Sequence, residues 1–219
     1  MQHKLIAVVG PTGAGKSDLG LEIVDQIVAA GGKAEIVNCD SMQFYSGMDI
    51  GTAKLPVSER AGIAHQMLDV LEVTQDSTVA WYQDKARAAI AEIHSRGKSA
   101  VIVGGTGLYI KAILDDLNFP DTDPAVRERL NAEAEEFGVA QLFERLRLLD
   151  PAAAAAIDIQ NVRRVIRALE VIEITGQPFT ANLPREDSSL YPDALQFGLV
   201  MDREKLTERI DHRVDLMWE

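Results

Sequence analysis

An octapeptide near the amino terminus limits the possible folds more than any other stretch of this sequence. Residues 10–17 read GPTGAGKS and match G-x-x-x-x-G-K-[ST] in full, between an apolar run at 4–9 and a helical apolar pattern at 17–30. A glycine-rich loop between a strand and a helix turns backbone N–H groups and the helix N-terminus toward phosphate oxygens. The pattern predicts a di- or triphosphate site formed by Gly10, Pro11, Thr12, Gly13, Ala14, Gly15, Lys16 and Ser17.

Two side chains of this loop carry its charge chemistry. Lys16 supplies a positive charge, and the hydroxyl group of Ser17 is suited to hold Mg²⁺, which makes Mg²⁺ the predicted cofactor. The alternative is a glycine-rich turn with a chance lysine, and the strand and helix patterns on either side argue against it. The motif does not say whether the phosphates belong to ATP.

Strand and helix patterns continue to alternate after the loop. A strand is expected at about 35–39 (EIVNC), with Asp40 at its carboxyl end, and a helix at about 79–95. Residues 99–103 (SAVIV) form a continuous apolar run, typical of a strand buried on both faces, and a glycine-rich segment and a short helix follow. This order predicts an α/β fold: a P-loop NTPase-like parallel sheet flanked by helices, with right-handed crossovers.

The pattern changes to helices alone after residue 120. Asp123-Pro124 and Asp150-Pro151 each combine an N-capping residue with proline at the first helical position. The predicted organisation is therefore a P-loop α/β core at 1–120, an all-helical insertion at 121–190, and a return to the core at 191–219, with a strand at about 195–201 and a helix capped by Asp202.

Composition excludes several classes of protein. The 219 residues carry a net charge of −12, from 22 Lys and Arg against 34 Asp and Glu, which argues against a generic nucleic-acid binder. The single cysteine, Cys39, excludes an internal disulfide framework and lies in a predicted buried strand, where an inert thiol is expected. With no apolar run of about 18 residues and no signal peptide, we expect a cytoplasmic monomer with no membrane partner.

The role of Asp40 stays open on the residues alone. P-loop kinases and ATPases commonly place a magnesium-binding aspartate at the end of a second hydrophobic strand, but the run at 99–103 ends in glycines. Asp40 either takes that magnesium-binding role or accepts a proton from a nucleophile.

Several motifs, taken in order, resemble one family. GPTGAGKS is followed by DSMQFY at 40–45, GMDIGTAK at 47–54, VGGTGLYIKAI at 103–113 and RRVIRALEV at 163–171. This set is similar to the tRNA dimethylallyltransferases, which transfer an isopentenyl-type group to N6 of the adenosine on the 3′ side of the tRNA anticodon. The resemblance runs from the first strand to the last helix, and GMDIGTAK is far more specific than the P-loop.

The resemblance implies a role for each part of the reaction centre. The loop would bind the diphosphate of dimethylallyl diphosphate rather than ATP, with Arg209 and Arg213 reaching the same group. Asp40 would accept the N6 proton as general base, and Thr12 and Thr106 would lie in the reaction channel. For Thr106 the alternative is a threonine that only shapes a glycine-rich turn.

The resemblance also implies contacts with the anticodon stem-loop of tRNA. The implied tRNA-binding residues are Asp40, Ser41, Met42, Gln43, Thr106, Arg127, Gln160, Asn161, Val162, Arg163 and Arg164. Gln43 suits an adenine edge because its amide both donates and accepts hydrogen bonds. The alternatives are that Gln43 is a capping or surface amide and that the arginines near 163–167 form surface ion pairs with Glu170 and Glu173.

Family members normally continue with further helices and a basic segment that closes around the tRNA, and the sequence in hand has no counterpart of them. Two other functions remain in view: a P-loop kinase for a small molecule or nucleotide, with 121–190 as its lid, and a nucleotide-binding or RNA-binding module without turnover.

Overall fold

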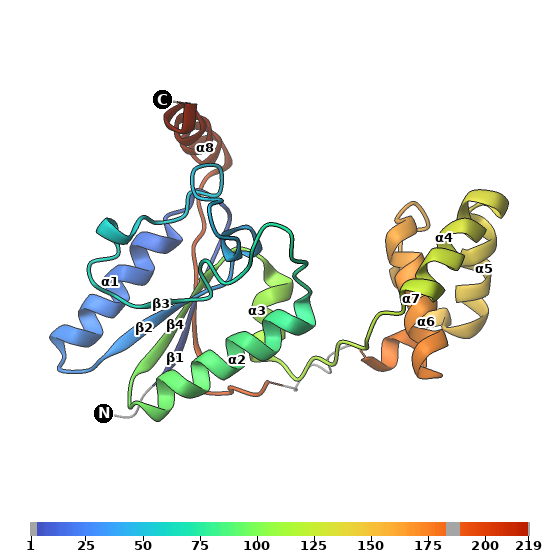
Figure 1. Ribbon diagram of the computed structural model, residues 1–219, viewed down its shortest axis with the longest axis horizontal. Coiled ribbons are helices and arrows are strands. Elements are labelled where there is room, and N and C mark those ends of the chain that lie inside the picture. Colours follow the sequence, from blue (N-terminus) through green and yellow to red (C-terminus); the bar gives the residue numbers. More distant parts are fainter. Residues whose placement is uncertain (1–3, 183–188, 219) are drawn as a thin grey trace. The chain divides into compact units, whose positions relative to one another are not determined.

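The chain divides into two compact units, each of which has its own core (Figure 1). The computed structural model describes residues 4–182 and 189–218. Unit 1 comprises Met1–Asp115 and Ser189–Glu219, and unit 2 comprises Asp116–Ser188. These boundaries fall a few residues from the predicted ones at 120 and 190.

Unit 1 is built on a five-stranded parallel sheet in the order β3-β2-β4-β1-β5. The expected strands are present, and β3 is a two-residue strand that the sequence pattern did not predict. The predicted strand at 195–201 is shorter than expected, because its partner β1 ends at Val9 where the glycine loop turns away. The strands are β1 (Leu5–Val9), β2 (Ala34–Asn38), β3 (His65–Gln66), β4 (Ser99–Gly104) and β5 (Leu195–Gly198).

Helices cover both faces of the sheet in unit 1. Ile6 and Val8 of β1 pack with Val24 of α1 (Lys16–Ala29) on one face. Leu5 and Ala7 point to the opposite face, toward α2 (Val79–Ser95) and α3 (Gly107–Leu114). This alternation buries both faces of β1 and β4, which explains why those strands are continuously apolar. Unit 1 ends with α8 (Arg203–Trp218), capped by Asp202 as predicted.

Unit 2 is all helical, and its helix starts were readable from the sequence. Asp123 accepts hydrogen bonds from the backbone of Ala125 and Val126, and Asp150 accepts one from Ala153. Both Asp-Pro signals therefore begin helices as predicted. The helices are α4 (Pro124–Phe137), α5 (Val139–Leu149), α6 (Pro151–Ala156) and α7 (Val162–Thr175); short 3-10 helices occur at Phe179–Asn182 here and at Ser41–Phe44 and Val57–Glu59 in unit 1.

A buried charge cluster ties together the amino ends of the strands in unit 1. Glu35, which is 1% exposed, accepts hydrogen bonds from Arg96, Lys98 and Gln66. Burial raises the pKa of Glu35, but the hydrogen bonds from these partners outweigh it and the pKa is lowered overall. The carboxylate thus stays charged and links β2 to β3 and to the end of α2.

We expect Glu35→Gln to lower the free energy of unfolding by about 2 kcal/mol at neutral pH, since two cations lose a buried anionic partner. A carboxylate with a lowered pKa stabilises the fold at pH values above the ordinary glutamate pKa of about 4.3. This stabilisation is lost as the pH falls through the pKa of the carboxylate in the folded protein. Urea unfolding at neutral and acidic pH checks this, and the deficit should shrink in acid. Glu92→Gln, which removes an exposed partner of Arg96, is the control; an equal loss there would contradict the prediction.

Candidate functional site

The glycine loop at 10–17 joins β1 to α1 at the carboxyl edge of the sheet. Gly13 and Gly15 have φ values of 84° and 90°, in the left-handed region that favours glycine. Lys16 donates a hydrogen bond from Nζ to the carbonyl oxygen of Pro11 at 2.8 Å, across the loop. The loop therefore already has the curled form that phosphate binding needs, with its lysine inside the curl.

Helix α8 lies against this loop. A Cβ atom on Gly13 would come within 3.0 Å of Ile210 Cγ1, and one on Gly15 would lie 3.9 Å from Arg209 Nη2. Arg213, one turn further along α8, has a buried Nε that finds no hydrogen-bond partner among the described residues. A buried guanidinium donor without an acceptor is costly unless a ligand supplies one. The contact of Arg209 and Arg213 with an anion stays a prediction, and both residues lie on the helix that packs against the loop.

Lys16, Asp40 and Arg213 share one electrostatic neighbourhood. Burial lowers the pKa of Lys16; the negative charge of Asp40 opposes this, and the positive charge of Arg213 adds to it. The carboxylate predicted to act as a base thus lies near the lysine predicted to hold phosphate. An anionic ligand at the loop would relieve the repulsion between Lys16 and Arg213.

The position of Asp40 is fixed by its neighbour Asn38. Asn38 is 6% exposed; its Nδ2 donates to the carbonyl oxygens of Asp40 and Met67, and its Oδ1 accepts from the Asp40 N–H. Asp40 Oδ1 in turn accepts from the Met42 N–H at 3.0 Å and caps the 3-10 helix Ser41–Phe44. The carboxylate is therefore oriented, and the residue is only half-buried.

The glycine segment after β4 lies beside the loop and brings Thr106 with it. A Cβ atom on Gly105 would be 3.0 Å from the Gly10 carbonyl oxygen and 3.4 Å from Lys16 Nζ. Thr106 is the N-cap residue of α3 and its carbonyl oxygen accepts from the N–H groups of Tyr109 and Ile110, but its side chain makes no capping hydrogen bond. Thr12 and Thr106 are both exposed, with hydroxyl groups available to a substrate.

Gln43 is held differently from the sequence prediction. Its Nε2 donates to the carbonyl oxygens of Thr52 at 3.0 Å and Ala53 at 3.4 Å. The amide donor is therefore used within the protein, and only Oε1 remains to accept a hydrogen bond. Of the neighbouring residues, Ser41 is among the groups that lower the pKa of Tyr109, although burial raises that pKa overall, and Met42 is 49% exposed.

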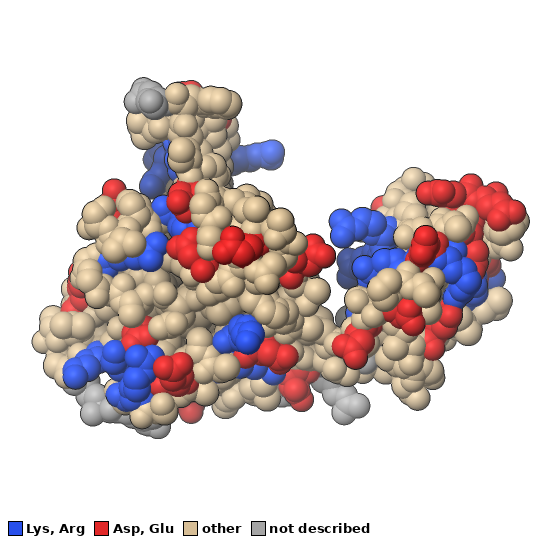
Figure 2. Space-filling model, in the orientation of Figure 1, with Lys and Arg blue, Asp and Glu red and all other residues tan. Residues whose placement is uncertain are grey.

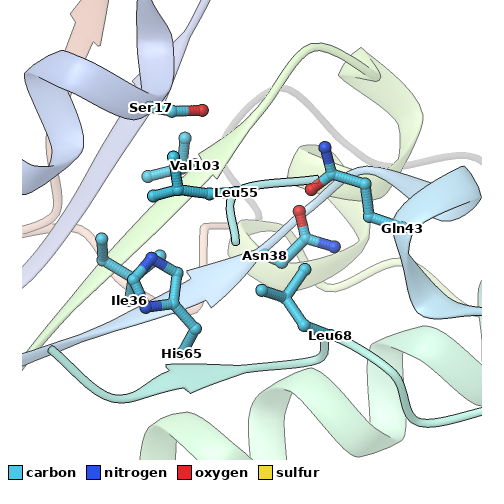
Figure 3. A pocket seen from close by; sticks show the side chains of 8 residues that line it. All are labelled: Ser17, Ile36, Asn38, Gln43, Leu55, His65, Leu68 and Val103. Carbon is cyan, nitrogen blue, oxygen red and sulfur yellow. The ribbon is translucent and has the colours of Figure 1, made fainter. Parts of the chain in front are cut away.

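A small cavity of about 30 Å³ lies between the loop and the end of β2 (Figure 3). Ser17, Asn38, Gln43 and His65 supply its polar lining. His65 binds the Ile63 carbonyl through Nδ1, and burial lowers the pKa of His65. A larger cavity of about 670 Å³ is lined by Leu19, Ile27, Phe197 and other residues toward the amino ends of the strands, away from this chemistry.

The described residues contain no group of three or more His, Cys, Asp or Glu placed to hold a metal ion. Ser17 is exposed at the start of α1, where its hydroxyl can contribute one oxygen ligand. Mg²⁺ usually takes one or two protein ligands together with substrate phosphates and water. This donor set fits Mg²⁺ arriving with a diphosphate and does not fit a resident metal cage.

In unit 2, two arginines that the sequence suggested for RNA contact are paired internally. Arg127 Nη2 lies 2.7 Å from Glu170 Oε2, and Arg167 Nη1 lies 2.8 Å from the same oxygen of this fully buried carboxylate. Arg167 also donates to the carbonyl oxygens of Pro120 and Asp121. The ion-pair alternative thus describes Arg167, while Arg127 keeps a half-exposed side chain.

The arginines at the start of α7 differ from Arg127 and Arg167. Arg163 and Arg164 are exposed and form no ion pair within the part of the chain that the structure describes. Asn161 caps α7 through its side chain, and Gln160 and Val162 are exposed on either side of it. Figure 2 shows basic side chains of unit 2 gathered beside acidic ones, so the negative overall charge hides local basic surface.

Sequence reasoning missed three residues that shape the site. Asn38 orients Asp40, Gly105 leaves room for the side chain of Lys16, and Lys54 is buried at the end of the loop at 45–54. A polar residue inside an otherwise apolar strand was a readable signal for Asn38. The expectation for Cys39 is met, since burial raises the pKa of its thiol to about 12.

These features define a P-loop α/β protein with a phosphate cradle, a nearby oriented carboxylate and a separate helical unit. The IPP transferase family model matches residues 43–219. A tRNA dimethylallyltransferase of Thermobifida fusca (strain YX) is 57% identical over 215 residues, which are 98% of this chain and 67% of that protein.

Two solved structures are also similar. The full-length tRNA isopentenylpyrophosphate transferase from Bacillus halodurans is 40% identical with a TM-score of 0.62, over 98% of this chain and 66% of that one. A eukaryotic dimethylallyltransferase acting on tRNA is 28% identical with a TM-score of 0.81, over 98% of this chain and 53% of that one. The chain belongs to the tRNA dimethylallyltransferase family. No helix among the described residues is long and apolar enough to cross a membrane.

We expect Gly13→Ala to weaken diphosphate binding about tenfold and to lower the melting temperature. The added Cβ is strained at this φ value and presses on Ile210, which together cost about 1–2 kcal/mol. Calorimetric titration with diphosphate and thermal unfolding measure the two effects. The control is Gly198→Ala, where a Cβ atom meets nothing within 4 Å; the prediction is wrong if Gly13→Ala binds as the control does.

Proposed function

We propose that this chain carries the catalytic core that transfers the dimethylallyl group of dimethylallyl diphosphate to N6 of the adenosine 3′-adjacent to the anticodon in tRNA, with release of diphosphate. The observation that carries the proposal is the nearness of Asp40 to Lys16, which puts a general-base candidate beside the phosphate cradle. A tRNA substrate also fits a cytoplasmic location.

The chemistry follows from these two groups. The N6 amine attacks C1 of the allyl group while the bond from C1 to the diphosphate oxygen breaks, and the electron pair leaves with the diphosphate. Lys16, Arg213 and the N–H groups of the loop stabilise the negative charge that develops on the leaving group. Asp40 accepts the proton that the amine loses, so charge and atoms balance.

Mg²⁺ fits this scheme through Ser17. Bound with the diphosphate, Mg²⁺ would neutralise part of its charge and make it a better leaving group. The protein's own part is to hold the phosphate oxygens on the loop and to keep the carboxylate of Asp40 on the other side of the reacting carbon.

The adenosine side of the site is suited to one orientation of the base. Gln43 offers only its Oε1 acceptor, because its amide donor is already bonded to Thr52 and Ala53. An acceptor beside Asp40 suits an amino group such as N6 and does not suit a ring carbonyl. The base must leave its stack to reach this point, as in other enzymes that modify a base.

Family membership favours this proposal over a kinase. In a kinase of this fold class a strand-end aspartate commonly binds Mg²⁺. Here Asp40 caps a turn that continues directly into the loop at 47–54, the most specific stretch shared with the family. Incubation with ATP and candidate acceptors should therefore give no ATP consumption.

We expect Asp40→Asn to lower the transfer rate at least about 100-fold, since the general base is lost. Diphosphate affinity should be unchanged or tighter because a nearby negative charge is removed, and asparagine can still accept the Met42 N–H. Single-turnover transfer with the full-length protein and unmodified tRNA, together with diphosphate titration, measures both. Asp25→Asn on the exposed side of α1 is the control. Full transfer by Asp40→Asn would rule out the base assignment.

We expect Arg163→Ala and Arg164→Ala each to weaken tRNA binding and to reduce its salt dependence by about one counterion, because each removes a free cation from the RNA-facing surface. Arg147→Ala is the matched control, since Arg147 is exposed but paired with Glu144. The measurement is the slope of the logarithm of the tRNA binding constant against the logarithm of the salt concentration. If both variants have the slope of the control, neither arginine contacts RNA.

A further inference from the structure

Lys54 is a buried lysine that the proposed chemistry does not use. Its side chain is 2% exposed, and its Nζ donates to the carbonyl oxygen of Tyr45 at 2.7 Å, to Asp49 Oδ1 at 2.8 Å and to Asp69 Oδ1 at 2.6 Å. All three ammonium donors are therefore satisfied. The three acceptors join the two ends of the loop at 45–54 to the turn after β3.

The cation is kept charged at an energetic cost. Burial lowers the pKa of Lys54, but hydrogen bonds and the charges of Asp49 and Asp69 outweigh it, so the pKa is raised overall. A buried ion pair adds little net stability compared with well-packed apolar side chains, whereas its directional bonds fix one geometry. Stability alone therefore does not explain why a charged lysine occupies position 54.

Two strained residues lie next to this lysine. Ala53 and Asp69 have φ values of 51° and 55°, in the left-handed region, where the strain is greater for alanine than for aspartate. Such strain persists only where the surroundings over-determine the backbone, and it concentrates at functional sites. Lys54 follows Ala53 in the chain and bonds Asp69 directly, so it is placed to hold both residues in this form.

The two strained residues hold Gln43 from both sides. The Ala53 carbonyl accepts from Gln43 Nε2, and the Asp69 N–H donates to the Gln43 carbonyl at 3.3 Å. Gln43 N–H in turn donates to the carbonyl of Asp40 at 3.1 Å. A short series of contacts thus runs from Lys54 through Gln43 to Asp40.

We propose that Lys54 is a positioning residue for adenosine attack: it locks the loop at 45–54 and the turn at 69 so that Gln43 Oε1 and the Asp40 carboxylate stand at fixed places. This inference rests on the proposed function and adds a residue to it. Lys54 touches neither diphosphate nor base. Its loss lowers the rate of the chemical step and leaves diphosphate binding intact.

The test compares Lys54→Met with Lys98→Met in the full-length protein. Lys98 is likewise paired with a carboxylate, Glu35, but its side chain is only partly buried and it lies at the opposite end of β2. Both variants lose an ion pair, so both should lose stability in thermal unfolding. Only Lys54→Met should lower kcat for transfer, by roughly 10- to 100-fold, because displacement of reacting groups by about 1 Å costs that much. Diphosphate affinity should match the wild type in both.

A second variant covers the case in which Lys54→Met does not fold. Asp69→Asn removes one charged acceptor, and asparagine tolerates the left-handed backbone at this position. We expect it to fold and to lower kcat about tenfold, with faster hydrogen exchange of the Gln43 amide. Lys98→Met should leave both readouts at wild-type values.

The outcomes separate the two proposals. Suppose that the wild type transfers the allyl group and that Asp69→Asn, and any folded Lys54→Met, keep the wild-type kcat and the wild-type hydrogen exchange at Gln43. That result would overturn the role of Lys54 and leave the proposed function standing. Absence of transfer by the wild type would refute the proposed function itself.

Discussion

The site depends on the close approach of two parallel strands at their carboxyl ends. A Cβ atom on Gly104 would lie 2.3 Å from the Cys39 carbonyl oxygen, so only glycine lets β4 and β2 pair up to that point. β4 also pairs with β1 through Gly104, and the glycine loop begins one residue after β1. The phosphate cradle, the Thr106 segment and Asp40 are neighbours because these three strand ends meet at one edge of the sheet. Loss of that approach would separate Asp40 from the glycine loop without changing either.

The positive charges of this acidic chain fall into two groups. Lys54, Lys98 and Arg167 are paired with carboxylates, and they fix a loop, a strand end and a helix start. Lys16 and Arg213 form no ion pair with a carboxylate in the ranges 4–182 and 189–218, although the charges of Asp40 and Arg213 both act on Lys16. Cationic side chains that form no ion pair are the ones open to an anionic ligand, whereas paired ones serve as scaffold. The net charge of −12 therefore says little about the face presented to a polyanion.

The features that sequence alone could predict are local ones. The glycine loop, the strand-helix alternation and the Asp-Pro helix starts depend on residues close together in the chain, and the structure confirms them. The two-residue strand β3 has too short a pattern to detect, and it exists only because β2 offers a free edge. The donor state of Gln43 and the pairing of Arg127 with Glu170 depend on partners 9 and 43 residues away, respectively. No spacing rule reveals such pairings. The sequence therefore indicated candidate residues but not the hydrogen-bond partners that those residues have in the structure.

The insertion of unit 2 ahead of β5 has a consequence for biosynthesis. β1 is a central strand, but its second neighbour, Leu195–Gly198, leaves the ribosome only after the whole of 116–188 has been made. At roughly 5–20 residues per second, the nascent chain spends several seconds with one edge of β1 unpaired. During that interval the apolar strand next to the glycine loop is open to pairing with other nascent chains. The helical unit, whose contacts are local, has time to form first, so β5 docks late, onto a sheet whose other four strands precede it in the chain.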